Sequence, residues 1–382
     1  MALNLSRNSR LWVSTVDTGN DNTNTFEIPL QDGFSFSQAM TSEDVTVEEA
    51  GPTPTRGSKR FNSTLDPVEW SFATYITPYV WDTDKHQVVD ALLWHALASG
   101  SAPDLAGDDL GGVGDTPIYG GSSAFNVAFS DNTHHVLTEL FLFFKVDNQT
   151  FKIHAAQVNQ AELSIDIADI GMISWTGQGT TLETIADPAF MAGTGLAYVA
   201  TGGTSDDYVA IPTSKQYLLN KLTVMDLNSD VAPGGSPNDF YEIALTSASI
   251  TINNNITFVT PATLAVVDLP IGSFTGSFEV TGTVESYLKD TGGDGLVGTP
   301  FGSQELLEHM LVDRRVATAS SMKFYVGGIA SPVAEITIPN AQIAIPAISI
   351  DSVVSQSFEF KAMPTTDDLT DGGEIAFAFK AE

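Results

Sequence analysis

The stretch AQVNQAELSID at residues 156–166 returns as AQIAIPAISID at residues 341–351, a spacing of 185 residues. Five positions are identical, and Val158 and Leu163 of the first copy are replaced by Ile in the second. The ends of both copies alternate between apolar and polar residues, which is typical of a β-strand with one buried face. A strand that recurs in this form predicts that the chain contains one structural unit twice.

Weaker matches follow in the same order along both halves of the chain. FEIPL around Glu27 corresponds to YEIAL around Glu242, and LLWHAL at 92–97 corresponds to LLEHML at 306–311. The further expected pairs are Leu11 and Val13 with Leu222 and Val224, Trp70 and Phe72 with Phe278 and Val280, and Trp175 with Phe360. Together they predict a domain at residues 1–180, a linker or loop at 181–214 and a second domain at 215–382.

Short alternating segments, such as 278–281 and 335–338, dominate the chain and are separated by clusters of Gly, Asp, Asn and Pro. They predict a mainly β fold. Helical spacing of apolar residues is convincing only at 83–98 and 303–312. We therefore expect two β-sandwich or β-barrel domains, each with one flanking α-helix, and a Gly/Asp-rich loop at 99–123 in the first.

The charge of the chain is strongly negative. Its 382 residues contain 16 Lys and Arg against 47 Asp and Glu, a formal net charge of −31. Such a surface repels nucleic acid and anionic membranes at long range. Solubility in a salty habitat and a functional use of the charge are both consistent with this composition.

The chain has no Cys, which excludes disulfides, thiolate metal sites and a cysteine nucleophile. The N-terminus has no apolar segment of signal-peptide length, and no run approaches the roughly 18 apolar residues of a membrane helix. These features predict a soluble protein made in the cytoplasm, without a membrane anchor.

No catalytic or ligand-binding motif is present. The P-loop, H-E-x-x-H and G-x-S-x-G patterns are all missing. His134 and His135 have no third ligand at metal spacing, and a calcium loop from Asp290 fails because Gly292 and Phe301 occupy places that need acids. We predict that the chain is not an enzyme and has no catalytic, cofactor-binding or metal residues.

One basic cluster stands out in this acidic chain: Arg56, Lys59 and Arg60. It is either a solvated loop or a loop that docks onto an acidic surface of a neighbouring copy, and we favour the second interpretation because opposite charges on one molecule promote head-to-tail association.

The N-terminal third resembles the major tail tube proteins of tailed bacteriophages. The resemblance is carried by LNLSRNSRLWVSTV (3–16), DGFSFSQ (32–38) and EEAGPTPTRGSKRFNSTLDPVEWSFATYITPY (48–79), and it is strongest over residues 3–97 and 150–180. It implies a structural protein of the virion tail, made in the host cytoplasm, that forms rings whose inner strands join into one barrel. Stacked rings would form a tube for the tape measure protein and then for genomic DNA during ejection.

The resemblance also implies particular contacts. The loop at about 37–66, with Arg56, Lys59 and Arg60, would reach the next ring, and its counterpart would be about 253–276. Sheath and tail terminator proteins are further implied partners. Single-unit tube proteins form six-membered rings, so two units per chain predict trimeric rings of pseudo-sixfold symmetry. If one domain only decorates the outside of the tube, the resemblance instead implies rings of six chains.

Alternation along the repeated strand suggests which side chains line the lumen. Leu163, Ile165 and Ile167 should face the core, and the opposite face would then line a negatively charged lumen through Glu162, Ser164, Asp166, Ser349 and Asp351. The alternative function is an acidic β-sandwich module of a surface protein or a carbohydrate-binding protein, which would need a signal peptide and an exposed aromatic platform.

Overall fold

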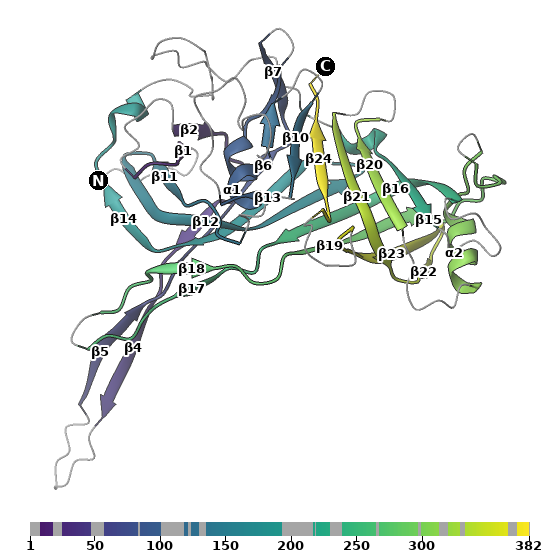
Figure 1. Ribbon diagram of the computed structural model, residues 1–382. Helices are drawn as coiled ribbons and strands as arrows, with labels where there is room; N and C mark the ends of the chain where they lie inside the picture. The colour runs from purple at the N-terminus through teal and green to yellow at the C-terminus, as the bar shows by residue number, and fades with distance from the viewer. Residues whose placement is uncertain are drawn as a thin grey trace.

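The computed structural model consists of β-strands with two α-helices in the part of the chain that it describes, which confirms the expected mainly β fold class (Figure 1). The described residues are 8–17, 25–46, 57–82, 85–100, 118–120, 124–129, 135–192, 217, 219–229, 239–264, 267–296, 299–312, 320–328, 333–365 and 373–381. No helix among them is long and apolar enough to cross a membrane.

The elements follow in chain order. The first half contains β1 (Ser9–Ser14), β2 (Thr25–Ile28), β3 (Ser35–Ser37), β4 (Met40–Thr46), β5 (Ser58–Leu65), β6 (Val68–Tyr75), β7 (Pro78–Asp82), β8 (Lys85–Val88), α1 (Ala91–Ala98), β9 (Ile118–Gly120), β10 (Phe125–Ala128), β11 (Leu140–Val146), β12 (Gln149–Asp166), β13 (Met172–Gly179), β14 (Thr181–Ile185) and the 3₁₀ turn Ala189–Ala192. The second half contains the 3₁₀ turn Asn220–Leu222, β15 (Val224–Ser229), β16 (Asp239–Asn253), β17 (Thr257–Val259), β18 (Gly272–Phe274), β19 (Glu279–Tyr287), α2 (Ser303–Val312), β20 (Ser320–Val326), β21 (Ala334–Ile343), β22 (Ala347–Ile350), β23 (Val354–Ala362) and β24 (Ala376–Phe379).

The second expected helix is confirmed as α2, but the first begins at Ala91 rather than at 83. The residues before it form the β7–β8 hairpin, in which Val80 pairs with His86. Valine and aromatic residues in this segment favour a strand, and that preference outweighs the helical spacing.

Six strands of the second half close into a barrel. The pairing runs β15–β16–β19–β23–β21–β20 and returns to β15, and every pair is antiparallel. Apolar side chains fill the interior, among them Tyr241, Ile250, Phe324 and Ile336, all fully buried. Closure leaves no free edge inside the cycle.

The first half repeats this pairing order. Strand β1 pairs with β2 and β11, β11 with β12, β12 with β13, β13 with β6, and β6 with β3. Residues 29–34 connect β2 to β3 along the chain, and Gln31 N donates to Ala73 O (3.1 Å) across this gap. Both halves also have a bulge at the same place, at Leu140/Leu142 and at Ser320/Met322.

The cross-strand partners give the register between the halves. Trp70 lies opposite Gly177, and at the same point of the second cycle Gly282 lies opposite Phe360. Each pair therefore combines one large aromatic ring with one glycine, in opposite order. A Cβ on either glycine would overlap the ring across from it.

This register corrects three expected matches. Trp70 corresponds to Gly282, Trp175 to Phe358, and Leu11 with Val13 to Met225 with Leu227. The match of Glu27 with Glu242 agrees with the structural register. The expected partner of Trp70 is four residues away from the structural one, that of Trp175 two, and those of Leu11 and Val13 three. Shifts of two and four residues preserve the alternation of a strand, so alternation alone does not determine the register.

Two junctions join the halves. The C-terminal part of β12 pairs with β16, so that the sheets of both cycles become one, and β24 pairs with both β21 and β10. Helix α1 contacts both junctions. The Trp94 ring packs 4.7 Å from that of Phe377 in β24, and Leu97 O accepts from Asn254 Nδ2 (2.9 Å) directly after β16. All eight residues of α1 are buried, as expected of a helix covered on every side.

Asp90, immediately before α1, gives a pH-dependent prediction. Thr74 Oγ1 donates to its Oδ2 (3.0 Å), and burial raises the pKa of Asp90 to about 6. Because the folded pKa lies above the unfolded value, its stabilising contribution is complete below about pH 4 and is lost as the pH rises through 6. Asp90→Asn keeps the acceptor for Thr74. We expect the free energy of unfolding of this variant to exceed that of the parent by about 2 kcal/mol at pH 8, with little difference at about pH 4.

Urea unfolding at both pH values measures this difference. The exposed Asp32→Asn is the control. A stability gain of Asp90→Asn that is the same at both pH values would contradict the assignment of the raised pKa to burial.

Candidate functional site

The joined sheet has one polar face, made by eight strands in the order β3–β6–β13–β12–β16–β19–β23–β22. Directly opposite residues of antiparallel strands point to the same side. One such row crosses both halves and consists of Ser174, Glu162, Thr251, Thr281 and Lys361. The other side of the sheet carries core residues such as Leu163, Trp175 and Ile250.

The polar face is acidic. Its carboxylates are Glu69, Glu162, Asp166, Glu279, Glu285 and Glu359. Where these eight strands pair with one another, Lys361 is the one cation among the described residues of this face, and it forms an ion pair with Glu279. The remaining side chains are mostly Ser, Thr, Asn and Gln, so the face carries net negative charge and little apolar surface.

The expected orientation of the repeated strand is partly right. Glu162, Ser164 and Asp166 lie on the polar face, opposite Thr251, Ser249 and Ser247, and Leu163 and Ile165 are buried. Ile167 is 50% exposed, because β12 ends at Asp166 and the chain turns away there.

In the second copy, Ser349 and Asp351 are exposed, but so are the residues expected in the core, with Ile348 51% and Ile350 84% exposed. The reason is the position of β22. It pairs with β23 on one side and, among the described strands, with nothing on the other.

Strand β3 is the opposite edge of the same sheet. It pairs with β6, and no other described strand lies beside it. Next to this edge, the rings of Phe34 and Phe36 stack 6.3 Å apart, and both are only partly buried. The sheet therefore has two open edges, each with apolar side chains on the core side.

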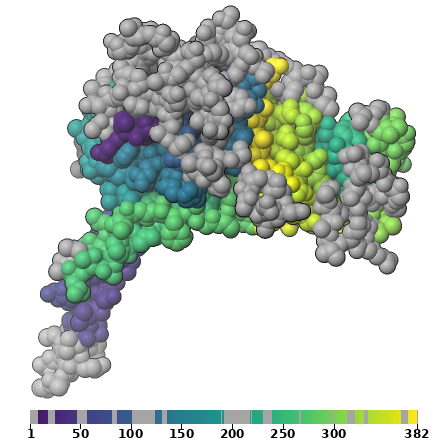
Figure 2. Space-filling model, viewed as in Figure 1, coloured from purple at the N-terminus to yellow at the C-terminus, as the bar shows by residue number. Residues whose placement is uncertain are grey.

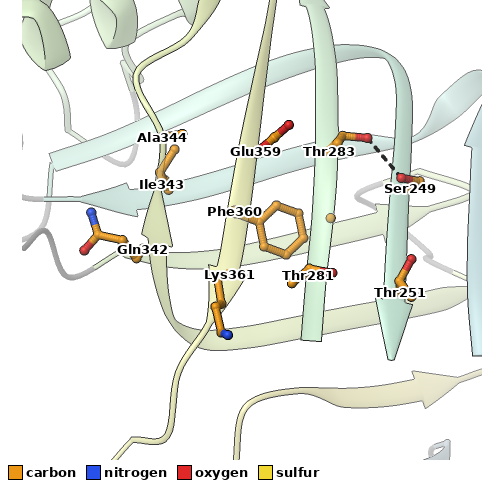
Figure 3. Close-up of a pocket in the computed structure, with 11 residues that line it drawn as sticks. Ser249, Thr251, Thr281, Thr283, Gln342, Ile343, Ala344, Glu359, Phe360 and Lys361 are labelled. Atoms are coloured by element: carbon orange, nitrogen blue, oxygen red, sulfur yellow. Dashed lines mark hydrogen bonds between the residues drawn. The ribbon is translucent and has the colours of Figure 1, made fainter. Parts of the chain in front are cut away.

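Two open depressions lie on the polar face at corresponding places. One, of about 290 Å³, is lined by residues that include Ser35, Ser71 and Thr176. The other, of about 530 Å³, is shown in Figure 3, where Thr283 Oγ1 lies 3.0 Å from Ser249 Oγ. Ser35 and Ser71 make the same contact at 2.8 Å in the first half. Each depression lies where pairing is interrupted, at the β12 bulge in one half and between β21 and β22 in the other.

A long arm projects from one end of the sheet (Figures 1 and 2). It consists of the β4–β5 hairpin with the β17–β18 segment alongside, within the expected segments 37–66 and 253–276. Lys59 and Arg60 are exposed on this arm, and Arg60 Nε lies 2.7 Å from Asp44 Oδ1. Arg56 lies outside the described residues.

Comparison with known proteins shows the family of the chain. The chain is 39% identical over 384 residues to tail tube protein pb6 of Escherichia phage T5, and the match covers 100% of this chain and 77% of that protein. The chain belongs to the phage tail tube protein family. No family model matches this chain. A solved chain of the anti-feeding prophage baseplate aligns with 36% of this chain and 87% of its own length, at 11% identity and a TM-score of 0.27, which is too low to support an argument.

Membership confirms several expectations. The tail tube protein is a structural component of the virion tail and not an enzyme. Trp70, Phe72 and Trp175 are buried in the core, so these aromatic residues do not form the exposed platform that carbohydrate binding would need.

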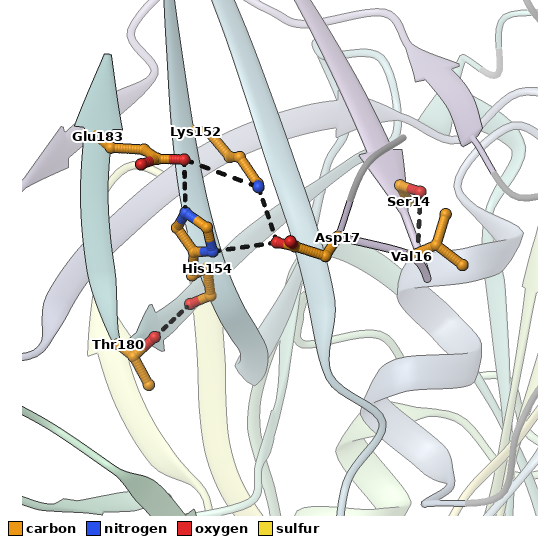
Figure 4. A network of polar contacts seen from close by, with 7 residues as sticks. All are labelled: Ser14, Val16, Asp17, Lys152, His154, Thr180 and Glu183. Carbon is orange, nitrogen blue, oxygen red and sulfur yellow. Dashed lines mark hydrogen bonds and ion pairs between the residues drawn. The ribbon is translucent and has the colours of Figure 1, made fainter. Parts of the chain in front are cut away.

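A polar network that sequence reasoning missed lies on the outer side of the first cycle (Figure 4). Lys152 Nζ lies 2.7 Å from Asp17 Oδ1, and the two ring nitrogens of His154 lie 3.2 Å from Asp17 and 2.7 Å from Glu183. The hydrogen bond from Lys152 holds the pKa of Asp17 below its usual value. The network ties β14 and the segment after β1 to β12, and its members are too far apart in sequence for any local pattern to bring together.

Proposed function

We propose that the tail tube protein assembles into rings of three chains with pseudo-sixfold symmetry, and that stacked rings form the conduit for DNA ejection. The observation that carries this proposal is the pair of open sheet edges, β22 and β3, in a chain whose β12–β16 junction already joins two equivalent sheets side by side.

The internal junction supplies the register for ring closure. In the junction, Leu163 lies opposite Ile250 and Ile165 opposite Ala248. By position in the repeat, Ile348 and Ile350 of β22 take the places of Leu163 and Ile165. The same mapping puts Phe36 in the place of Ile250 and Phe34 in that of Ala248, so Ile348 meets Phe36 of the next copy and Ile350 meets Phe34. Edge pairing would then bury the apolar side chains that each free chain exposes.

The two helices support the same seam. Trp94 of α1 is fully buried at the junction inside the chain, whereas Glu308, its counterpart in α2, is exposed. Leu311 and Val312 at the end of α2 are also exposed. The face of α1 is covered within the chain, and the corresponding face of α2 is exposed. We infer that a neighbouring chain covers this face of α2 in the ring.

The repeated pairing order supports a duplicated tube domain, with copies at about 1–180 and 215–382 and a linker or loop at 181–214. Each half contributes four strands to the joined sheet. A hexamer with one decorative domain would leave half of that sheet without a role, so the trimer is favoured.

Head-to-tail stacking is supported by the arm. Its exposed Lys59 and Arg60 suit an acidic surface of the next ring, and Arg56 belongs to the same basic cluster. Because such a contact joins two different surfaces and does not close on itself, it extends a filament. We propose that tail terminator and sheath proteins bind the ends and the outside of this filament.

The acidic polar face is proposed to line the lumen, through Glu162, Ser164, Asp166, Ser349 and Asp351. Negative charge there repels DNA phosphates, so DNA slides without binding. The tape measure protein would occupy the same space before ejection.

Reversing one lumen charge tests this assignment. We expect virions with Glu162→Lys to build normal tails but to release DNA about tenfold more slowly at low salt, because each new cation contacts phosphate. Timed DNA release measures the effect, which should shrink as the salt concentration rises. Glu139→Lys, at an exposed site outside the sheet, is the matched control. Equal release from both variants would contradict a lumen at this face.

A further inference from the structure

The β17–β18 segment of the second half does not project by itself. It lies against the arm of the first half, where Thr64 and Asp268 form a parallel bridge. Leu65 N donates to Asp268 O (2.8 Å), and Asp268 N donates to Ser63 O (3.1 Å). These contacts join segments that come from different copies of the repeat.

Asp268 is suited to this position. It is 9% exposed, its Oδ1 accepts from Thr263 N (2.8 Å), and its backbone is hydrogen-bonded to β5. We call the contact between Ser63–Leu65 and Asp268 the clasp.

The arm that the clasp holds together combines apolar surface from both copies. Leu264 is 95% and Ile271 71% exposed on the second segment, and Val45 and Phe61 are about half exposed on the β4–β5 hairpin. Solvated monomers rarely keep so much apolar surface on one projection, so it indicates a docking surface.

The end of the joined sheet opposite the arm also exposes large apolar side chains. Tyr75 ends β6, Tyr287 ends β19, and Ile167 and Val353 follow or precede strands at that end, all substantially exposed. Because the arm and this rim lie at opposite ends of one molecule, a second copy stacked above is the occupant that fits both.

We infer that the clasp makes the two segments one docking element, so that each ring presents three composite arms to the next ring rather than six independent ones. This inference rests on the proposed trimeric ring. Six separate arms would accept rings turned by 60°, whereas three composite arms accept only turns of 120°, so the clasp fixes the rotation between successive rings.

A disulfide lock tests whether the segments stay together on docking. Bridged positions lie about 5 Å apart, within the range that a disulfide spans, and the chain has no other Cys. We expect oxidised Thr64→Cys/Asp268→Cys to elongate tubes within about twofold of its reduced form, as followed by light scattering and negative-stain microscopy. Oxidised protein that forms rings but no tubes, with assembly restored by reductant, would overturn the inference.

Opening the clasp is the complementary test. Asp268→Pro removes the N–H that Ser63 O accepts, while Asp268→Ala keeps it. We expect Asp268→Pro to form rings but to elongate about tenfold more slowly than Asp268→Ala, the size of effect that a lost backbone hydrogen bond produces. Equal elongation rates of Asp268→Pro and Asp268→Ala would overturn the inferred role of the clasp in docking. Failure of the unchanged chain to form any ring would instead overturn the proposed function.

Discussion

Replacing Ile348 and Ile350 with Asp will stop ring formation and leave a folded monomer. Both side chains are exposed in the free chain, so we expect the free energy of unfolding to change by less than about 0.5 kcal/mol. In the proposed seam, each carboxylate would be buried against Phe34 or Phe36 without a partner. Such burial costs several kcal/mol, so ring affinity should fall by at least about a thousandfold.

Sedimentation velocity and denaturant unfolding of the same samples separate these two effects. Leu222→Asp is the matched control, because Leu222 is 66% exposed and lies outside both sheet edges. Rings of normal size from the double variant would show that β22 is not the closing edge.

Gly177→Ala will destabilise the fold strongly for so small a change. A Cβ at Gly177 would overlap both the Trp70 ring and Gln157 O, and the backbone oxygen cannot move aside as a flexible side chain would. Overpacking of this kind costs about 3 kcal/mol. Gly57→Ala is the control, since nothing lies within 4 Å of a Cβ there.

The corresponding pair in the second half offers a test of whether overlap with the Trp70 ring causes this loss of stability. Trp70→Gly with Gly177→Phe copies the Gly282–Phe360 pair of the other cycle. We expect the double variant to be more stable than the sum of its single changes by at least about 1 kcal/mol, because each change makes room for the other. Strictly additive losses in urea unfolding would mean that the two cross-strand pairs are not equivalent.

Local patterns in the sequence predicted the elements but not their exact register. The alternation in 156–166 predicted a strand with Leu163 and Ile165 buried, and α2 has the bounds 303–312 that its apolar spacing predicted. The register of Trp175 was wrong because a two-residue shift preserves the same alternation, and bulges change the spacing between strands.

The exposure of Ile350 had a different cause. Its sequence context matches that of Ile165, yet β12 lies between two strands, and β22 has one neighbour among the strands that the structure describes. In the proposed ring, Ile350 becomes buried only on assembly, which no property of the strand itself reveals. The clasp at Asp268 and the network around His154 depend on contacts between segments distant in the chain, and local spacing carries no information about them.

In the proposed ring, three chains close through β22 and β3. A density map of assembled tubes measures this arrangement. We expect three chains in each ring, one continuous sheet around the lumen, and Ile350 of each chain opposite Phe34 of the next. Six chains per ring, or a β22 edge without a neighbouring strand, would contradict it.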